Sequence, residues 1–393
     1  MSEDVPGFEA EIETNADVRD GVQARYGAGA QSVEAALCCP VDYDPQYLKI
    51  IPQEVLDRDY GCGDPSAYVR AGDTVLDLGS GGGKICFIAS QIVGPEGRVI
   101  GVDMTDEMLK LARESAPVVA DALGYANVEF RRGHIEDLRL DLDRLDAWLA
   151  EHPVRGVAEL EAMEAEALRL STELPMIADD SVDVIVSNCV LNLVSDSKKR
   201  QLFKEMYRVL KVGGRVAVSD IVSDEKSPDA LKADARLWSG CISGALTERG
   251  FVQALEEAGF HGITVDKLEA DPWQIVEGIE YRSATVLAYK GKAGECLETN
   301  KAVIYKGPWS FVKDDDGHVF ERGVRSAVCE KTYRLMQREP YVGQFVNVEP
   351  AVEVTERIAW PADDCGVRVR EPGETKRGKP KVTTDPSQGS SCC

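Results

Sequence analysis

The chain of 393 residues carries 45 lysine and arginine residues against 68 aspartate and glutamate residues, which gives a net charge of −23 at pH 7. A field of that sign repels phosphate backbones and anionic lipid headgroups, so neither nucleic acid nor a membrane surface is an expected partner. The length and a hydrophobic content of 44% suffice for one large core and an accessory domain.

The N-terminus is acidic and has no basic segment followed by an apolar stretch, so we expect no secretory signal. No apolar run is long enough to span a bilayer. These features predict a cytoplasmic protein. In a reducing compartment we interpret its eleven cysteines as thiols for metal, metalloid or redox chemistry, or as core residues, in preference to a disulfide framework.

Strands and helices alternate from about residue 74 to residue 290, which predicts a parallel sheet covered by helices on both faces. A stretch rich in Leu, Ala and Glu at helical spacing interrupts this order and predicts an inserted helical hairpin over residues 139–173. Beyond the sheet, short aromatic and β-branched runs predict a small, mainly β domain. The end of the chain is rich in Pro, Gly, Ser and Lys, which is typical of disorder.

We therefore divide the chain into four segments. They are an N-terminal segment with candidate substrate and redox cysteines (1–70), the sheet domain (71–291), a C-terminal domain (292–370) and a flexible tail (371–393).

A glycine-rich loop follows the first predicted strand, where Asp77, Gly79, Gly81 and Gly83 form a D-x-G-x-G-x-G pattern. Glycines let backbone N–H groups approach a ligand closely, and the next helix adds partial positive charge at its N-terminus. Asp103 ends the second strand, where an acidic side chain accepts both hydroxyls of a ribose. The spacing of the glycines favours S-adenosylmethionine over a dinucleotide.

A third ligand element follows the third strand in the segment GHIED. There Glu136 is placed to accept from an adenine amino group while Ile135 covers the ring, although a solvated surface role for Glu136 remains open. Met104, directly after the ribose-binding position, and Asn188, at the end of the fourth strand, complete the expected cofactor contacts.

Five cysteines are candidate site thiols, and at least two of them flank loops that face the same crevice. Cys189 ends the fourth strand, Cys241 follows a predicted helix, Cys62 lies in a Gly- and Pro-containing loop, and Cys38 and Cys39 precede a turn. Each alone is more typical of a small buried residue. Together, thiolates select soft elements, and three of them around an element with a lone pair leave that lone pair free to attack a sulfonium methyl. Such a displacement needs no general base, which fits a chain with four histidines.

Several segments together resemble the S-adenosylmethionine-dependent arsenite methyltransferases, over about residues 20–290. The segments are YGCGDP, VLDLGSGGGK, GVDMTDEML, GHIEDL, SNCVLNLV, RVLKVGGR and LWSGCISGAL. The resemblance implies that Cys189 and Cys241 bind As(III), that Cys62 is a third thiol, and that Cys38 or Cys39 pairs with Cys62 during turnover. It also implies that Tyr60 lies on the cofactor and that a thiol reductant such as glutathione or thioredoxin restores trivalent arsenic between rounds.

The prediction is a class I methyltransferase with a doubly wound, mostly parallel seven-stranded sheet whose last strand is antiparallel. We expect a monomer that methylates trivalent arsenic held by Cys62, Cys189 and Cys241, a reaction of arsenic detoxification. Two other functions stay open. One is a methyltransferase of another metalloid, a thiol or a small carbon nucleophile, with structural cysteines. The other is a non-catalytic metal- or metalloid-binding protein.

Overall fold

The computed structural model describes residues 15–31, 41, 43–291, 294–361 and 368–376. They form two compact units, one ending at Lys290 and the other beginning at Gly291. Cys38 and Cys39, the two predicted redox partners, lie outside the described residues, as does the chain from residue 377 onward.

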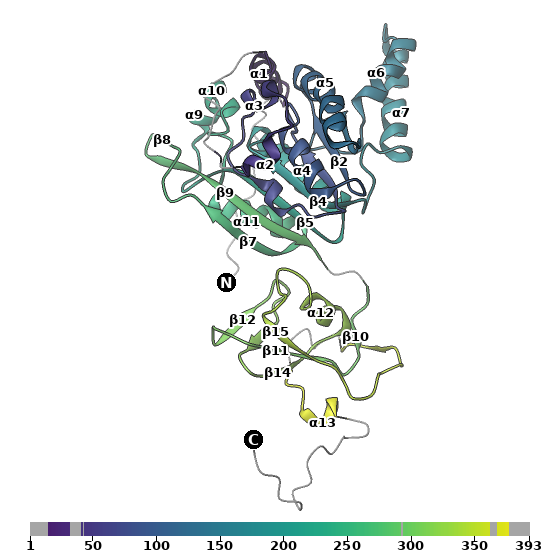
Figure 1. The fold of residues 1–393 in the computed structure, drawn as a ribbon, viewed down its shortest axis with the longest axis vertical. Helices are drawn as coiled ribbons and strands as arrows, with labels where there is room; N and C mark the ends of the chain where they lie inside the picture. The colour runs from purple at the N-terminus through teal and green to yellow at the C-terminus, as the bar shows by residue number, and fades with distance from the viewer. Residues whose placement is uncertain (1–14, 32–40, 42, 292–293, 362–367, 377–393) are drawn as a thin grey trace, which may run out of the picture. The chain divides into compact units, whose positions relative to one another are not determined.

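A mixed sheet forms the centre of the first unit (Figure 1). Its strands are β1 (Thr74–Leu78), β2 (Arg98–Asp103), β3 (Val128–Arg132), β4 (Val182–Asn188), β5 (Leu210–Ser223), β6 (Leu246–Thr247), β7 (Phe260–Leu268), β8 (Gln274–Val276) and β9 (Ile279–Lys290). The main path is β3-β2-β1-β4-β5-β9-β7, in which β3 to β5 are parallel and β9 is antiparallel to both neighbours. The predicted seven-stranded sheet is confirmed along this path. Two short strands, β6 and β8, were not expected.

Helices cover both faces of the sheet. They are α1 (Asn15–Gly29), α2 (Pro45–Leu48), α3 (Gln53–Asp57), η2 (Pro65–Tyr68), α4 (Lys84–Val93), α5 (Asp106–Leu123), α6 (Leu142–Glu151), α7 (Val157–Glu173), η3 (Leu191–Leu193), α8 (Asp196–Val209), α9 (Asp229–Lys232), α10 (Ala235–Ser239) and α11 (Glu248–Ala258). Strand residues alternate between two cores: Leu76 and Leu78 pack with α8 and α11, and Val75 packs with α4 and α5. Burial on both faces explains why the strands read as nearly continuous apolar runs.

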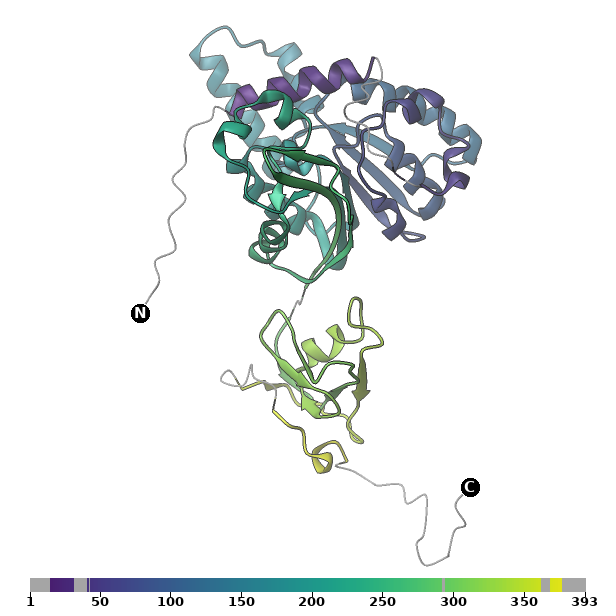
Figure 2. The same ribbon diagram turned by 90° about the vertical axis from the view of Figure 1, so that its left-hand side faces the viewer.

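Residues 139–173, the predicted helical hairpin, contain α6 and α7, which pack on each other beside the edge strand β3 (Figure 1). The first helix of the chain, α1, lies across the carboxyl ends of the strands, against α5, α10 and η3 (Figure 2). In the part of the chain that the structure describes, no helix combines the length and the apolar character that crossing a bilayer requires.

The second unit is mainly β, as predicted, with a core of Val303, Tyr305, Phe320, Tyr333 and Phe345 among others. Its elements are β10 (Leu297–Glu298), β11 (Ala302–Tyr305), β12 (Phe311–Lys313), β13 (Val319–Glu321), β14 (Arg325–Ala327), α12 (Glu330–Leu335), β15 (Phe345–Val348), β16 (Ile358–Ala359) and α13 (Pro372–Thr375). They pair as β14-β11-β15, β10-β16 and β12-β13.

The predicted tail begins at residue 371, and the structure places a short helix in its first residues. Residues 372–375 form α13, which begins at Pro372 and is capped at its N-terminus by a capping box between Glu371 and Glu374. Thr375 is buried and accepts a hydrogen bond from Arg325 at 2.6 Å. The sequence E-P-G-E therefore encodes a helix start that a composition argument overlooks.

Candidate active site

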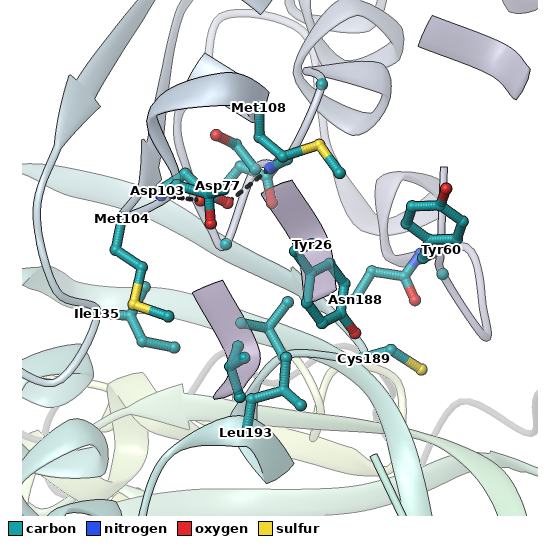
Figure 3. A pocket seen from close by; sticks show the side chains of 18 of the residues that line it. Tyr26, Tyr60, Asp77, Asp103, Met104, Met108, Ile135, Asn188, Cys189 and Leu193 are labelled. Atoms are coloured by element: carbon teal, nitrogen blue, oxygen red, sulfur yellow. Dashed lines mark hydrogen bonds between the residues drawn. The ribbon is translucent and has the colours of Figure 1, made fainter. Parts of the chain in front are cut away.

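A pocket opens at the carboxyl ends of β1, β2 and β4, where the strand order reverses and where open α/β sheets bind ligands. Figure 3 shows Asp77 and Asp103 together at one end of it and Cys189 with Tyr60 at the other. Nine of the ten residues predicted to contact a cofactor line this pocket: Tyr60, Asp77, Gly79, Gly81, Asp103, Met104, Ile135, Glu136 and Asn188.

Gly83, the tenth, is not among the lining residues. It is the N-cap of α4 in a left-handed conformation, with φ of 92°. A β carbon added there would lie 2.8 Å from the ring of Phe130. This glycine therefore allows close packing of the helix on the neighbouring strand.

The glycine loop is held open by the residue that ends β2. The Asp103 carboxylate accepts from the Gly81 N–H at 2.9 Å and from the Thr105 N–H at 2.8 Å. The Gly79 N–H in turn donates to the Val102 carbonyl at 2.8 Å. The Thr105 side chain and the Met104 backbone also hydrogen-bond this carboxylate, which lines the pocket where a ligand can reach it.

Gly79→Ala is expected to abolish cofactor binding. The residue has φ of 72°, and a β carbon would lie 2.4 Å from Val190 Cγ1, so the loop must shift. Gly124→Ala is the matched control, because φ is 79° there but no atom lies within 4 Å of the added carbon. Calorimetric titration with S-adenosylmethionine checks this, and equal affinities for the two variants would contradict it.

The wall opposite the glycine loop is closed by α1. Glu136, which is buried, forms an ion pair with Arg19 of this helix, and Tyr26, two turns further along the same face, also lines the pocket. The adenine contact expected of Glu136 stays a prediction, and in the structure its carboxylate pairs with Arg19. Residues 19, 22 and 26 all line the pocket, and their helical spacing in the sequence is the signal that points to this face of α1.

Asn188 fastens the loop that carries Cys62 to the end of β4. Its Oδ1 accepts from the Cys62 N–H at 2.9 Å and from the Gly63 N–H at 3.2 Å, and its Nδ2 donates to the Gly63 carbonyl at 2.7 Å and to the Tyr43 hydroxyl at 3.0 Å. A β carbon at Gly61 would lie 2.2 Å from Asn188 Nδ2, so only glycine allows this approach. The amide side chain is thus fully used within the protein.

The three predicted substrate thiols converge in one buried cluster, but they are not three free thiols. Cys62 and Cys189 form a disulfide, of which Cys241 is not part. The loop fastened by Asn188 places the Cα atoms of the pair 5.9 Å apart, a separation that a disulfide spans. The pairing expected for Cys62, with Cys38 or Cys39, is therefore not the one in this structure.

Cys241 lies directly beside this disulfide. Its thiol donates to the Cys189 carbonyl at 3.0 Å and lies 3.8 Å from the Tyr26 hydroxyl. Of the three cysteines, Cys189 alone is among the residues that line the pocket. Both Cys189 and Cys241 adopt positive φ, of 56° and 61°, which is uncommon for residues other than glycine and is found at functional sites.

Asp220, which the sequence analysis did not select, is buried beside the sulfur atoms of Cys62 and Cys189, with its ligand atom within 4.8 Å of both. Its carboxylate accepts from the N–H groups of Leu191 at 2.9 Å and Ile221 at 2.8 Å, and from Asn192 Nδ2 at 2.8 Å. Burial raises the pKa of Asp220 to about 7, although these donors oppose the shift. It holds the chain that follows Cys189 in place.

Asp220→Asn is expected to lower the free energy of unfolding by about 1–3 kcal/mol, because an amide leaves at least one of these buried donors without an acceptor. Methylation should fall more than tenfold, while cofactor affinity stays within about threefold since Asp220 does not line the pocket. Urea unfolding, kinetics and titration measure the three effects. Asp224→Asn is the control, since that exposed carboxylate accepts from the Glu280 N–H at 3.0 Å and lies away from the buried thiols. Equal loss of turnover in both variants would contradict the assignment.

Comparisons with known proteins agree with this geometry. A family described as a methyltransferase domain matches residues 70–173 and 159–259, and a domain of unknown function matches residues 292–380. The arsenite methyltransferase of Aquipseudomonas alcaligenes is 34% identical, over 84% of this chain and 90% of its own length. That of Halobacterium salinarum is 40% identical, over 63% of this chain and 53% of its own length.

One solved structure is similar over most of the chain. It is an arsenic(III) S-adenosylmethionine methyltransferase from Chlamydomonas reinhardtii, with 26% identity and a TM-score of 0.53. The match covers 82% of this chain and 99% of that one.

Proposed function

The chain belongs to the arsenite methyltransferases, S-adenosylmethionine-dependent enzymes, and we propose that it holds trivalent arsenic on Cys62, Cys189 and Cys241 once a thiol has opened the Cys62–Cys189 disulfide. The convergence of these three sulfur atoms beside the pocket is the observation that carries the proposal. Thiolates are the ligands that soft elements select.

The residues that line the pocket suit S-adenosylmethionine. The Asp103 carboxylate can accept from ribose hydroxyls, and Ile135 and Met104 offer apolar surface for a ring. Gly79 lies so close to Val190 that no side chain fits there. The bare backbone of the loop can therefore present its N–H groups to a ligand. When bound, S-adenosylmethionine supplies an electrophilic methyl group on a positively charged sulfur.

Arsenic on three thiolates keeps one lone pair. As this lone pair forms a bond to the methyl carbon, the bond from carbon to the sulfonium breaks and its electrons return to that sulfur. Arsenic is formally oxidised by two electrons and no proton is transferred, so the buried site needs no general base. The protein contributes alignment and exclusion of water, with Tyr26 lying between Cys241 and the pocket.

Two steps consume electrons, and we propose a thiol such as glutathione or thioredoxin as their source. Two thiols convert the Cys62–Cys189 disulfide into two cysteines and form one new disulfide. A further pair returns pentavalent arsenic to the trivalent state. We also propose that the enzyme is cytoplasmic, where such thiols are kept reduced, and that it acts as a monomer, because residues of one chain supply both the pocket and the thiols.

The test is to incubate the purified full chain with arsenite, S-adenosylmethionine and glutathione, and to separate the arsenic species with element-specific detection. Methylated arsenic is expected only when all three are present. Antimonite and selenite are run in parallel to test other acceptors. Absence of methylated arsenic with a reduced protein that binds S-adenosylmethionine would overturn the proposal.

Affinity for S-adenosylmethionine is expected to weaken as pH falls through 7. Burial raises the pKa of Asp77 to about 7, against a hydrogen bond from the Cys86 thiol at 3.2 Å. A cationic ligand favours the ionised carboxylate, so binding releases a proton below this pH and Kd rises, approaching about tenfold per pH unit. Titration at several pH values measures it, with Asp77→Asn as the variant that should remove the slope. An equal slope in that variant would assign the proton to another group.

A further inference from the structure

Two free thiols lie together in the second unit, far in sequence from the pocket. Cys296 precedes β10 and is exposed, and Cys329 precedes α12 and is buried. Strand β10, which directly follows Cys296, contacts helix α12, whose N-cap is Cys329, so the two cysteines lie at one junction of the fold. Partial desolvation raises the pKa of Cys296, and the neighbouring Cys329 raises it further through its charge and a side-chain hydrogen bond, against the opposing effect of Lys331. The pair therefore presents one accessible sulfur backed by a second.

The two segments that carry these thiols are fixed on each other by polar contacts. Glu330, next to Cys329, accepts from the Thr299 hydroxyl at 3.0 Å and pairs with Lys301 at 3.0 Å. The Cys296 carbonyl accepts from the Trp360 N–H at 2.8 Å. The thiol of Cys329 is itself oriented, because it accepts from the Thr332 N–H at 3.4 Å. A ligand that bridges both sulfurs would pay little to order them.

The number of thiols decides which arsenical such a site suits. Arsenite has three oxygen ligands that thiols can replace, whereas a trivalent arsenical with one carbon substituent has two. When it meets two thiols, two As–O bonds break and two As–S bonds form, and the thiol protons leave with the hydroxyl groups as two molecules of water. Arsenic stays trivalent, so this step needs no oxidant or reductant.

We propose that Cys296 and Cys329 form a second, two-thiol binding site that takes trivalent monoorganoarsenicals, the chemical class of a once-methylated product. This ligand class follows from the proposed function, but the thiols are not among those proposed for methyl transfer. Two thiols held together bind such a ligand more tightly than one, since the second bond forms at a high effective concentration.

The test uses the reduced full chain and phenylarsine oxide, a monoorganoarsenical of fixed valence. The protein is treated with iodoacetamide with and without the probe, and alkylation of Cys296 is followed by peptide mass spectrometry. We expect the probe to slow alkylation of Cys296 at least about tenfold. Cys329→Ser should abolish this protection, because one thiol alone releases the arsenical. Equal alkylation with and without the probe, or protection that survives Cys329→Ser, would overturn the proposal.

Two further variants separate a lost site from a misfolded unit. Serine at position 329 keeps an oxygen that can accept from Thr332 N–H, so the start of α12 is preserved. Cys296→Ser changes an exposed residue and should bind one phenylarsenic fewer per chain by native mass spectrometry. Cys365→Ser is the matched cysteine control and should leave the protection of Cys296 intact; loss of protection there would assign the second thiol to Cys365.

Cys62→Ser separates this proposal from the proposed function. That variant should lose methylation of arsenite and still show protection of Cys296. If Cys296 is unprotected in an enzyme that methylates arsenite, the second site alone is refuted. If Cys296 is protected in a protein that makes no methylated arsenic, the proposed function alone is refuted.

Discussion

Serine in place of Cys241 or Cys189 is expected to lower methylation of arsenite at least about 100-fold, and the Cys241 variant should leave the affinity for S-adenosylmethionine unchanged. Serine has nearly the same size as cysteine, but its hydroxyl is a poor ligand for a soft element. Cys241 does not line the pocket and touches the disulfide through the Cys189 carbonyl, so its loss should affect arsenic alone.

The measurement pairs turnover with titration of the cofactor for each variant. Retained affinity shows that the sheet and its loops are intact, so lost turnover then reports on the thiols. Cys189→Ser also removes the disulfide and leaves Cys62 as a free thiol, which alkylation should detect. Full turnover in both variants would show that the cysteines are structural and that the acceptor is held by other groups.

Asp103→Ala is expected to weaken binding of S-adenosylmethionine at least about 100-fold, because the ligand loses two hydrogen bonds to a charged acceptor, each contributing about 1.5–3 kcal/mol. The same change releases the Gly81 N–H, so the glycine loop loses its anchor. Burial raises the pKa of Asp103, against the hydrogen bonds from Thr105 and Gly81. Hydrogen bonds from the ligand would therefore stabilise the ionised form of this buried carboxylate further.

Asp103→Asn should fall between the wild type and Asp103→Ala, since one acceptor oxygen remains. Asp106→Ala is the matched control three residues away. Its side chain is 64% exposed, it pairs with Arg132, and it does not line the pocket, so cofactor affinity should not change. A loss in Asp106→Ala as large as in Asp103→Ala would mean that the effect comes from the start of α5 and not from the ribose.

The parts of the fold that the sequence predicts best are those with a strong local signal. Strands such as β1 and β4 are buried on both faces, so their apolar runs are unmistakable, and Asp77, Gly79 and Asp103 follow from motif spacing. The role of α1 was missed because it depends on Arg19 meeting Glu136, a contact between residues 117 positions apart. Such a pairing is set by packing and leaves no local pattern.

The redox state of the thiols could not be derived from the sequence for a similar reason. Cys62 and Cys189 are 127 residues apart, and their separation in space depends on the hydrogen bonds that Asn188 makes with the loop that carries Cys62. The sequence predicts Cys189 at the carboxyl edge of the sheet and Cys62 in a loop that can close over the cofactor, but several pairings among the eleven cysteines satisfy these constraints.

Asn188 joins the cofactor pocket to the disulfide. It directly precedes Cys189, and its side-chain amide holds the loop of Tyr60, Gly61 and Cys62. Tyr60, Gly61, Asn188 and Cys189 all line the cofactor pocket. The two segments that form this wall of the pocket are therefore the same two segments that the Cys62–Cys189 disulfide links. Thermodynamic reciprocity then ties the two events: if bound S-adenosylmethionine shifts the reduction potential of this disulfide, reduction must shift the affinity for S-adenosylmethionine by the equivalent free energy. The redox state of the disulfide and the occupancy of the cofactor site are then thermodynamically linked.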